Sequence, residues 1–219
     1  MIDYLAKEVQ IKSNDRVRNH GEVLTARREV EAMLDLVKNE SERIDSSFLE
    51  PACGDGNFLV AILERKLKTV ASRYRTKKAD FEVQMLSALA SIYGIDLLED
   101  NVQIARNRMF EIACDCYKDS LKVKPDEQFQ NIMKFILLKN ILQGDSLNGI
   151  DKIVFTQWTL VNYQFNRKEF SFSQLNQQAE ILNTPLFAFL TNEKGEDVFI
   201  PQPIKEYPLT FYRNLGGLI

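Results

Sequence analysis

The chain has 219 residues, of which 45% are hydrophobic and 27% charged, and this composition excludes wholesale disorder and predicts a soluble protein with one core. No run approaches the roughly 18 apolar residues of a membrane span, and the acidic start does not resemble a signal peptide, so we expect a cytoplasmic protein without membrane contact. The net charge of −3 disfavours strong autonomous binding to nucleic acid, and the basic runs at 65–68 and 73–78 are more typical of a solvated surface.

The first predicted elements are a helix, a strand and a second helix. Residues 25–37 have the period of an amphipathic helix, with Thr25 as the expected N-cap and an apolar face formed by Val30, Met33, Leu34 and Val37. A short apolar strand at 47–50 runs into a glycine-rich turn. Helical spacing then resumes over 58–67, which completes a unit of strand, turn and helix.

The same alternation continues through the middle of the chain. A helix at 81–89 leads to an apolar strand at 91–95, and a long helix begins near Glu99 and continues past Cys116. Further elements are expected as a helix at 129–138, a strand at 140–143 and a fourth strand at 151–155. Strands that alternate with helices predict a parallel sheet with right-handed crossovers.

The last third of the sequence has a different character. Residues 158–178 are rich in Asn, Gln, Phe and Ser without a clear period, whereas 186–190 and 197–200 resemble the two strands of a hairpin. We therefore expect three regions. These are a helical segment at 1–40, an α/β core at 41–157, and an irregular segment with a hairpin at 158–219 that completes or extends the sheet.

Residues suited to ligand binding follow three of the predicted strands. The first strand is followed by the glycine-rich residues 50–56, the second by Asp96 and the third by Asp145. Because ligands bind at the carboxyl ends of parallel strands, these positions should converge. Gly54 and Gly56 leave room for close approach, and Asp96 can accept hydrogen bonds from both ribose hydroxyls. Asp145 can accept one from the adenine amine, so the pattern predicts an adenosine pocket.

Two other interpretations of the turn are weaker. A strand followed by a glycine-rich turn is common and is weak as a signal by itself, but here two acidic residues support it. An NAD site requires Gly-x-Gly-x-x-Gly at the start of the helix, and the third glycine position counted from Gly54 holds Leu59.

The cysteines do not indicate a metal site. The chain has three, an odd number, which is most simply explained by reduced thiols. Cys114 and Cys116 stand two residues apart on a predicted helix and therefore face different directions. No second cysteine pair or nearby histidine completes a ligand set, so we expect no metal.

Four motifs resemble those of the N6-adenine DNA methyltransferases of bacterial restriction-modification systems. Residues 50–58, with the sequence EPACGDGNF, are similar to the cofactor loop of that family. Residues 21–25 resemble its N-terminal motif, which closes over the methionine end of the cofactor. Residues 93–96 resemble its ribose-binding motif and 143–147 its adenine-contacting motif. The four follow the family's order over about residues 20 to 147.

The resemblance implies a class I methyltransferase fold, Rossmann-like with a mainly parallel sheet flanked by helices, shortened on its C-terminal side. The implied cofactor is S-adenosyl-L-methionine and the implied partner is DNA, reached through a partner subunit or recognition protein because only about seventy residues follow Asp145. The implied cofactor-binding residues are Thr25, Glu50, Pro51, Ala52, Cys53, Gly54, Asp55, Gly56, Asn57, Phe58, Asp96, Leu97, Asp145 and Ser146.

The family's catalytic motif is missing from this chain. It consists of Asn or Asp, two prolines and an aromatic residue after the fourth strand, where it holds the adenine amine of a flipped base. Thr156, Gln157 and Trp158 occupy the expected position. Gln157 could hold an amine and Trp158 could stack on a base, but without the proline pair the geometry changes. Packing of Trp158 in the core is the alternative.

Three functions therefore remain open from the sequence. The first is an adenine-N6 DNA methyltransferase component of a restriction-modification system, which acts alone or with a partner. The second is an inactive protein that binds the cofactor and serves as a regulatory or interaction subunit. The third, methylation of RNA or protein, has no feature in its favour, because glutamine methylation uses a similar Asn-Pro-Pro-Tyr motif.

Overall fold

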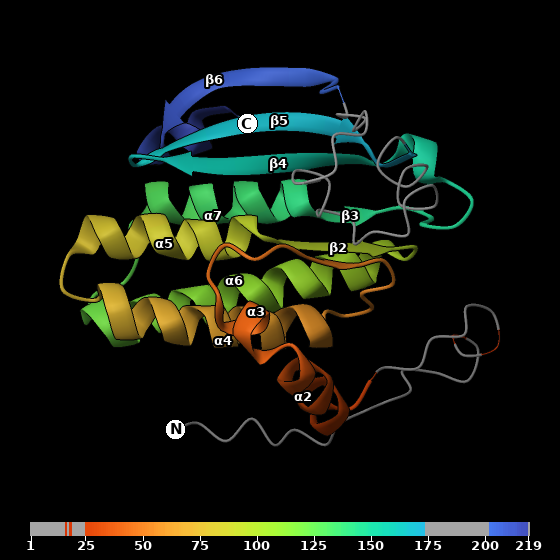
Figure 1. The fold of residues 1–219 in the computed structure, drawn as a ribbon, viewed down its shortest axis with the longest axis horizontal. Coiled ribbons are helices and arrows are strands. Elements are labelled where there is room, and N and C mark those ends of the chain that lie inside the picture. The colour runs from red at the N-terminus through yellow and green to blue at the C-terminus, as the bar shows by residue number, and fades with distance from the viewer. Residues whose placement is uncertain (1–15, 17, 19–24, 174–201, 219) are drawn as a thin grey trace, which may run out of the picture.

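The computed structural model describes residues 16, 18, 25–173 and 202–218, which form an α/β fold with two separate three-stranded sheets (Figure 1). One sheet is parallel and is flanked by helices, and the other is antiparallel and lies on the far side of α5 and α7 in the view of Figure 1. None of the helices in the described ranges is both long and apolar enough to cross a membrane.

The parallel sheet contains the first three strands in the order β1-β2-β3, which are Phe48–Glu50, Ile92–Asp96 and Ile141–Gln143. Leu49 lies opposite Tyr93, and Ile95 lies opposite Leu142. All three strands agree with those predicted from the sequence, except that Asn140 ends the preceding helix. The architecture is compatible with a Rossmann-like fold, and it brings the carboxyl ends of β1, β2 and β3 to one edge.

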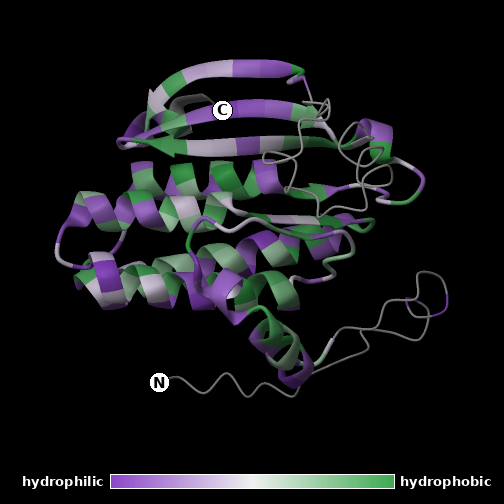
Figure 2. Cartoon of the chain, viewed as in Figure 1, coloured by the Kyte–Doolittle hydropathy of each residue, from purple (hydrophilic) through white to green (hydrophobic). Residues whose placement is uncertain are grey.

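Within residues 25–173, six helices precede or connect these strands, and Figure 2 shows hydrophobic and hydrophilic residues alternating along them, as expected when one helix face is buried. The long connecting helices α4, α5, α6 and α7 confirm the predicted helices. The bounds are α2 Arg27–Leu36, α3 Lys38–Glu42, α4 Asn57–Tyr74, α5 Lys78–Ala90, α6 Glu99–Leu121 and α7 Glu127–Asn140.

Close packing of α4 on β2 depends on a glycine in the strand. A Cβ atom at Gly94 would lie 2.7 Å from Leu59 Cδ1 and 3.1 Å from Cys53 Sγ. Both neighbours are buried. The absence of a side chain at this position therefore lets the β1–α4 loop and the start of α4 rest directly on the central strand.

Two details of α2 differ from the sequence prediction. Ala26 is the N-cap residue and no side chain caps the helix, so the prediction of Thr25 as the N-cap is wrong. Val30 and Leu34 are buried, but Met33 is 52% exposed and Val37 is 45% exposed. The core therefore covers only half of the apolar face of α2, and the Met33 side chain stays accessible at the surface.

The antiparallel sheet is the largest departure from the predicted fold. Residues 150–152 form a 3-10 turn, and β4 (Val154–Val161), β5 (Gln164–Ser171) and β6 (Lys205–Phe211) pair in the order β4-β5-β6. The prediction of 151–155 as a fourth strand of the parallel sheet is therefore wrong, as is that of an irregular segment from 158 onward. The predicted boundary at 157 falls inside β4. The predicted hairpin strands, 186–190 and 197–200, lie outside the described residues.

An aromatic cluster joins the two sheets. Tyr93 of β2 makes an edge-to-face contact with Phe155 of β4, and Phe155 makes another with Phe172. The Tyr93 hydroxyl donates a hydrogen bond to the Thr156 carbonyl at 3.0 Å. These contacts fix β4 above the face of the parallel sheet, which keeps it out of the plane of that sheet.

A buried carboxylate fastens the C-terminal turn η3, Tyr212–Leu218, to the helices. Glu82 of α5 is 1% exposed and accepts hydrogen bonds from the hydroxyls of Tyr117 at 2.7 Å and Tyr212 at 2.9 Å. It also forms an ion pair with Arg213, whose guanidinium reaches Asp126 at 2.8 Å. The network satisfies a charge that would otherwise be buried alone.

A buried lysine holds the beginnings of β1 and β2 together. Lys66 Nζ donates to the carbonyls of Ile44 and Ser46 and to the Ser91 hydroxyl, and the residue is fully buried. Burial lowers the pKa of Lys66 to about 7. Folding therefore requires this amine either to lose its charge or to remain charged among oxygen acceptors.

This lysine should make stability depend on pH. The unfolded amine titrates near 10.5, so between about pH 7 and 10.5 Lys66 keeps a proton in the unfolded chain that it has lost in the folded chain. The contribution of Lys66 to the free energy of unfolding should rise with pH in this window, by up to about 1.4 kcal/mol per pH unit, and should be measured below about pH 8, where the buried thiols and tyrosines do not yet titrate in the unfolded chain. Urea unfolding of the wild type and of Lys66→Met should reveal the slope only in the wild type. Lys68→Met, at an exposed position, should keep it.

Candidate functional site

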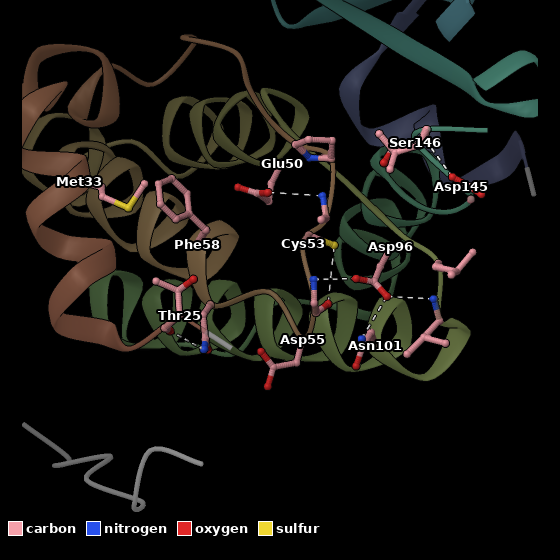
Figure 3. A pocket seen from close by; sticks show the side chains of 18 residues that line it. Thr25, Met33, Glu50, Cys53, Asp55, Phe58, Asp96, Asn101, Asp145 and Ser146 are labelled. Carbon is pink, nitrogen blue, oxygen red and sulfur yellow. Dashed lines mark hydrogen bonds between the residues drawn. The ribbon is translucent and has the colours of Figure 1, made fainter. Parts of the chain in front are cut away.

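A pocket of about 540 Å³ opens at the carboxyl ends of the parallel strands (Figure 3). It receives residues from α2, from the β1–α4 loop, and from the ends of β2 and β3. The lining residues are Thr25, Met33, Glu50, Pro51, Ala52, Cys53, Gly54, Asp55, Asn57, Phe58, Asp96, Leu97, Leu98, Asn101, Gly144, Asp145, Ser146 and Leu147. Every predicted cofactor-binding residue is among them except Gly56, which is buried at the end of the loop. Positions separated by up to 121 residues along the chain thus meet at one site.

The loop between β1 and α4 uses left-handed backbone at both glycines. Gly54 has φ +54° and Gly56 has φ +88°, conformations that other residues resist. The Cys53 amide donates to the Ile95 carbonyl at 2.8 Å, and the Gly56 amide donates to the Cys53 carbonyl at 2.9 Å. The loop therefore follows the end of β2 closely before it enters α4.

Gly56 is also sterically required. A Cβ atom there would lie 2.9 Å from Ala105 Cβ on α6. We expect Gly56→Ala to lower the free energy of unfolding by about 1–3 kcal/mol. The new methyl group would press against Ala105, and alanine would have to adopt a positive φ that is unfavourable for it. In the double variant, Ala105→Gly should restore only the part of the lost free energy of unfolding that comes from the contact with Ala105. Chemical denaturation of both variants checks this, and equal stability of Gly56→Ala and wild type would contradict it.

Asp96 organises the pocket from the end of β2. One carboxylate oxygen, Oδ2, accepts a hydrogen bond from the Gly54 amide at 2.8 Å. The other, Oδ1, accepts from the Leu98 amide at 2.9 Å and from Asn101 Nδ2 at 3.1 Å (Figure 3). The side chain thus ties the glycine loop to the start of α6. A carboxylate oxygen has two acceptor positions, so Oδ2 can still accept from a ligand.

Asp145 lies on the opposite wall, after β3. Its Oδ1 accepts hydrogen bonds from the amides of Leu147 and Asn148, both at 2.9 Å. The backbone amide of Asn148, then that of Leu147, lowers the pKa of Asp145, so the group is a carboxylate near neutral pH. The side chain is fixed by its own loop and exposes acceptor capacity to the pocket.

Glu50 and Cys53 face the pocket from the first strand and its loop. The Ala52 amide lies 3.4 Å from Glu50 Oε1, but burial dominates and raises the pKa of Glu50. Burial also raises the pKa of the Cys53 thiol, with a further contribution from Asp96. Cys53 is therefore a protonated, inert thiol that packs under the loop, and it is unsuited to nucleophilic chemistry.

The start of α2 closes the other side of the pocket. Asn57 Nδ2 donates to the Thr25 carbonyl at 3.1 Å, which connects the first residue of the described segment to the start of α4. Met33 and Phe58 lie side by side at this wall in Figure 3. Together with the exposed Leu97 and Leu147, they give the rim an apolar character.

The lining of the pocket is electronegative. It contains four acidic residues, which are Glu50, Asp55, Asp96 and Asp145, and no lysine or arginine among the residues that line it in the described ranges. Arg108 lies behind the loop, where Nη1 donates to the Asp55 carbonyl at 2.8 Å and lies 3.1 Å from Asp55 Oδ1. A positively charged ligand is therefore favoured over a phosphate-bearing one.

Several lining residues were missed by sequence reasoning. Asn101 and Leu98 follow the acidic residue of β2, and their role depends on the way α6 begins beside the loop. Met33 has the spacing of a core residue, and only its exposure separates it from Leu34. No signal in the sequence distinguishes these positions, because each reaches the pocket through tertiary packing.

The residues at the expected catalytic position lie elsewhere. Thr156 is 1% exposed, and its carbonyl accepts the hydrogen bond from Tyr93. The Trp158 indole donates to Asn140 Oδ1 at 2.8 Å and packs between Phe135 and Phe165. None of Thr156, Gln157 or Trp158 lines the pocket at the strand ends. The reason is that β4 belongs to the antiparallel sheet.

No described group of three or more His, Cys, Asp or Glu side chains has the arrangement needed to hold a metal ion.

In comparisons with known proteins, no family model, curated protein or solved structure matches the chain significantly. The chemistry of the pocket itself therefore carries the functional conclusion.

Proposed function

We propose that the pocket at the strand ends binds S-adenosyl-L-methionine. The observation that carries this proposal is the convergence of Gly54, Asp96 and Asp145 from three strand ends on one electronegative pocket. Asp96 is suited to the ribose hydroxyls and Asp145 to the adenine amine. The sulfonium and the α-amino group of the cofactor are both cationic, and Glu50 and Asp55 offer negative charge on the remaining wall.

The same charge pattern disfavours the common alternatives. ATP and NAD carry phosphates, which proteins bind with lysine, arginine or a helix N-terminus. The start of α4 offers backbone amides, but four carboxylates surround the approach and no cationic side chain lines the described pocket. Calorimetry should therefore detect binding of S-adenosyl-L-methionine and none of ATP or NAD. Binding of ATP with equal affinity would refute the proposal.

The lineage that we propose is that of the N6-adenine DNA methyltransferases of restriction-modification systems, in a class I methyltransferase fold. Support comes from the four motifs between about residues 20 and 147. All four contribute lining residues to this pocket: Thr25 comes from the motif at 21–25, and the others come from 50–58, 93–96 and 143–147. On this proposal, DNA is the methyl acceptor and is reached with the help of a partner subunit.

A second candidate function is supported by the position of β4. Of the residues that would hold the target amine, Thr156 and Trp158 make hydrogen bonds away from the pocket, and Gln157 does not line it. The chain would then bind the cofactor without transferring the methyl group, as a regulatory or interaction subunit. Of the two candidates, this one agrees better with the observed geometry.

Methyl transfer separates the two candidates. Purified protein should be incubated with tritiated S-adenosyl-L-methionine and unmethylated DNA, both alone and with the products of neighbouring genes. The inactive candidate predicts cofactor binding by calorimetry with no label in DNA under either condition. Label incorporated by the chain alone would eliminate it, whereas label that requires a partner would identify the partner as the source of the missing residues.

A further inference from the structure

The four acidic residues that line the pocket at the strand ends differ in how well the protein itself satisfies their charge. Asp96 accepts hydrogen bonds from three donors, and Asp145 accepts them from two backbone amides of its own loop. Asp55 forms an ion pair with Arg108, whose Nη1 lies 3.1 Å from Oδ1 without the geometry of a hydrogen bond. Glu50 is the exception, because no lysine or arginine of the described ranges pairs with it.

The Glu50 side chain is partly buried and has only a weak partner. Among the described residues, its one hydrogen bond comes from the Ala52 amide at 3.4 Å, which is long for a bond of this kind. Burial raises the pKa of Glu50, which means that the surroundings disfavour the charged form. A cation beside this carboxylate would offset that cost. Glu50 is therefore the lining residue that gains most from a positively charged ligand.

The order of the strands determines which part of the proposed cofactor reaches Glu50. Glu50 ends β1, Asp96 ends β2 and Asp145 follows β3, in a sheet with the order β1-β2-β3. Neighbouring strands lie about 4.8 Å apart, so the three positions follow one another along the edge of the sheet. In S-adenosyl-L-methionine the ribose lies between the adenine and the sulfur. With adenine at Asp145 and ribose at Asp96, the sulfur therefore reaches the end of β1.

We propose that Glu50 selects the positively charged sulfonium, so that the pocket binds S-adenosyl-L-methionine in preference to its demethylated form, S-adenosyl-L-homocysteine. This inference rests on the proposed function and deepens it. The two molecules share the adenosine and the amino acid, and they differ by one methyl group and one positive charge. Contacts to the adenine and the ribose cannot separate them, whereas a carboxylate beside the sulfur can. An opposite charge within about 4–6 Å stabilises an ionised group by about one to three powers of ten.

Two apolar side chains complete the site for the sulfonium. Phe58 of α4 and Met33 of α2 line the same pocket, and in Figure 3 the Glu50 carboxylate points toward them. The face of an aromatic ring attracts a cation that lies within about 6 Å. An apolar wall also suits the methyl group that the sulfonium carries. The charge and the methyl group of the ligand thus both find complementary surfaces.

Selection for the charged form has a consequence for the regulation of the site. Methyl transfer turns S-adenosyl-L-methionine into S-adenosyl-L-homocysteine, so a pocket that binds both equally is blocked as the product accumulates. A pocket that discriminates stays available to the methyl donor. If the chain is an inactive subunit, its occupancy reports the supply of the methyl donor. If it is an active enzyme, the product leaves readily.

Calorimetric titration of the full chain with three ligands tests this selection. The ligands are S-adenosyl-L-methionine, S-adenosyl-L-homocysteine and sinefungin, in which a carbon that bears an amine replaces the methylated sulfur. Sinefungin therefore keeps a positive charge at this position but lacks both the sulfur and its methyl group. We expect S-adenosyl-L-methionine and sinefungin to bind at least about tenfold more tightly than S-adenosyl-L-homocysteine.

A variant assigns the selection to Glu50. Glu50→Gln removes the charge, keeps the size of the side chain, and should weaken binding of the two cationic ligands by about tenfold. Its affinity for S-adenosyl-L-homocysteine should not change. Without ligand, it should unfold at the wild-type temperature or above, since it loses a carboxylate whose charge is disfavoured by burial. Glu111→Gln, at an exposed position on α6, is the matched control and should equal the wild type in all three titrations.

Three results overturn the selection by Glu50. The first is binding of S-adenosyl-L-homocysteine that equals or exceeds that of S-adenosyl-L-methionine. The second is equal weakening of both by Glu50→Gln, which would place their common α-amino group beside this residue. The third is sinefungin that binds no better than S-adenosyl-L-homocysteine, which would assign any preference to the methyl group. In all three cases binding of S-adenosyl-L-methionine still supports the proposed function, whereas failure of all three ligands to bind refutes both proposals.

Discussion

Replacing Asp96 with alanine is expected to weaken binding of S-adenosyl-L-methionine by about 100-fold or more. The carboxylate accepts hydrogen bonds from Gly54, Leu98 and Asn101, and on the proposed function it also contacts the ribose. A hydrogen bond to a charged group contributes about 1.5–3 kcal/mol, so loss of this group should affect both the loop and the ligand. Calorimetric titration of the wild type and the variant measures the difference.

Two further variants make this measurement specific. Asp96→Asn keeps the shape of the side chain but removes its charge and one acceptor, so its affinity should fall between those of wild type and Asp96→Ala. Asp115→Ala removes an exposed carboxylate on α6 and should bind as the wild type does. Unchanged affinity in Asp96→Ala would mean that the ligand, if bound, does not use this edge of the sheet.

Replacing Glu82 with alanine is expected to destabilise the protein by about 3–5 kcal/mol. The change leaves the hydroxyls of Tyr117 and Tyr212 without their acceptor. It also removes the Glu82 carboxylate that pairs with Arg213, whose guanidinium stays mostly buried. Removing one member of a buried ion pair is costly because the remaining charge stays desolvated. Urea unfolding followed by circular dichroism measures the loss.

The neighbouring residues supply the controls for this prediction. Glu82→Gln retains one acceptor for the tyrosine hydroxyls but loses the ion pair with Arg213. Its free energy of unfolding should therefore lie between those of Glu82→Ala and the wild type. Lys78→Ala removes a half-exposed amine 3.7 Å from Glu82 and should change stability by less than about 1 kcal/mol. If Glu82→Ala unfolded at the wild-type urea concentration, the network would not stabilise the fold.

The candidate site could be predicted from the sequence because its residues follow from local rules. A glycine turn or an acidic residue that directly follows a parallel strand lies at the carboxyl edge of the sheet, independently of how the rest of the chain packs. Gly54, Asp96 and Asp145 all belong to this class. Met33 and Asn101 do not, since their place at the pocket depends on how α2 and α6 pack.

The antiparallel sheet could not be predicted in the same way. Its hairpin turns at Asn162 and Tyr163, which both have positive φ, as the favoured two-residue hairpin turn requires, but the sequence lacks the glycine that usually marks it. β5 is largely polar and pairs with β6, more than thirty residues later. Strands with little hydrophobic alternation are specified by their partners, and those contacts are distant in the sequence.

The link between Asp96 and Gly54 has a consequence for the kinetics of binding. The Gly54 amide is bonded to Asp96, so the protein's own contacts fix the conformation of the loop and little ordering remains to oppose binding. A preorganised loop of this kind should associate with its ligand in one step, at a rate that rises linearly with ligand concentration. The amide hydrogen of Gly54 should also exchange slowly with solvent both before and after the pocket is filled.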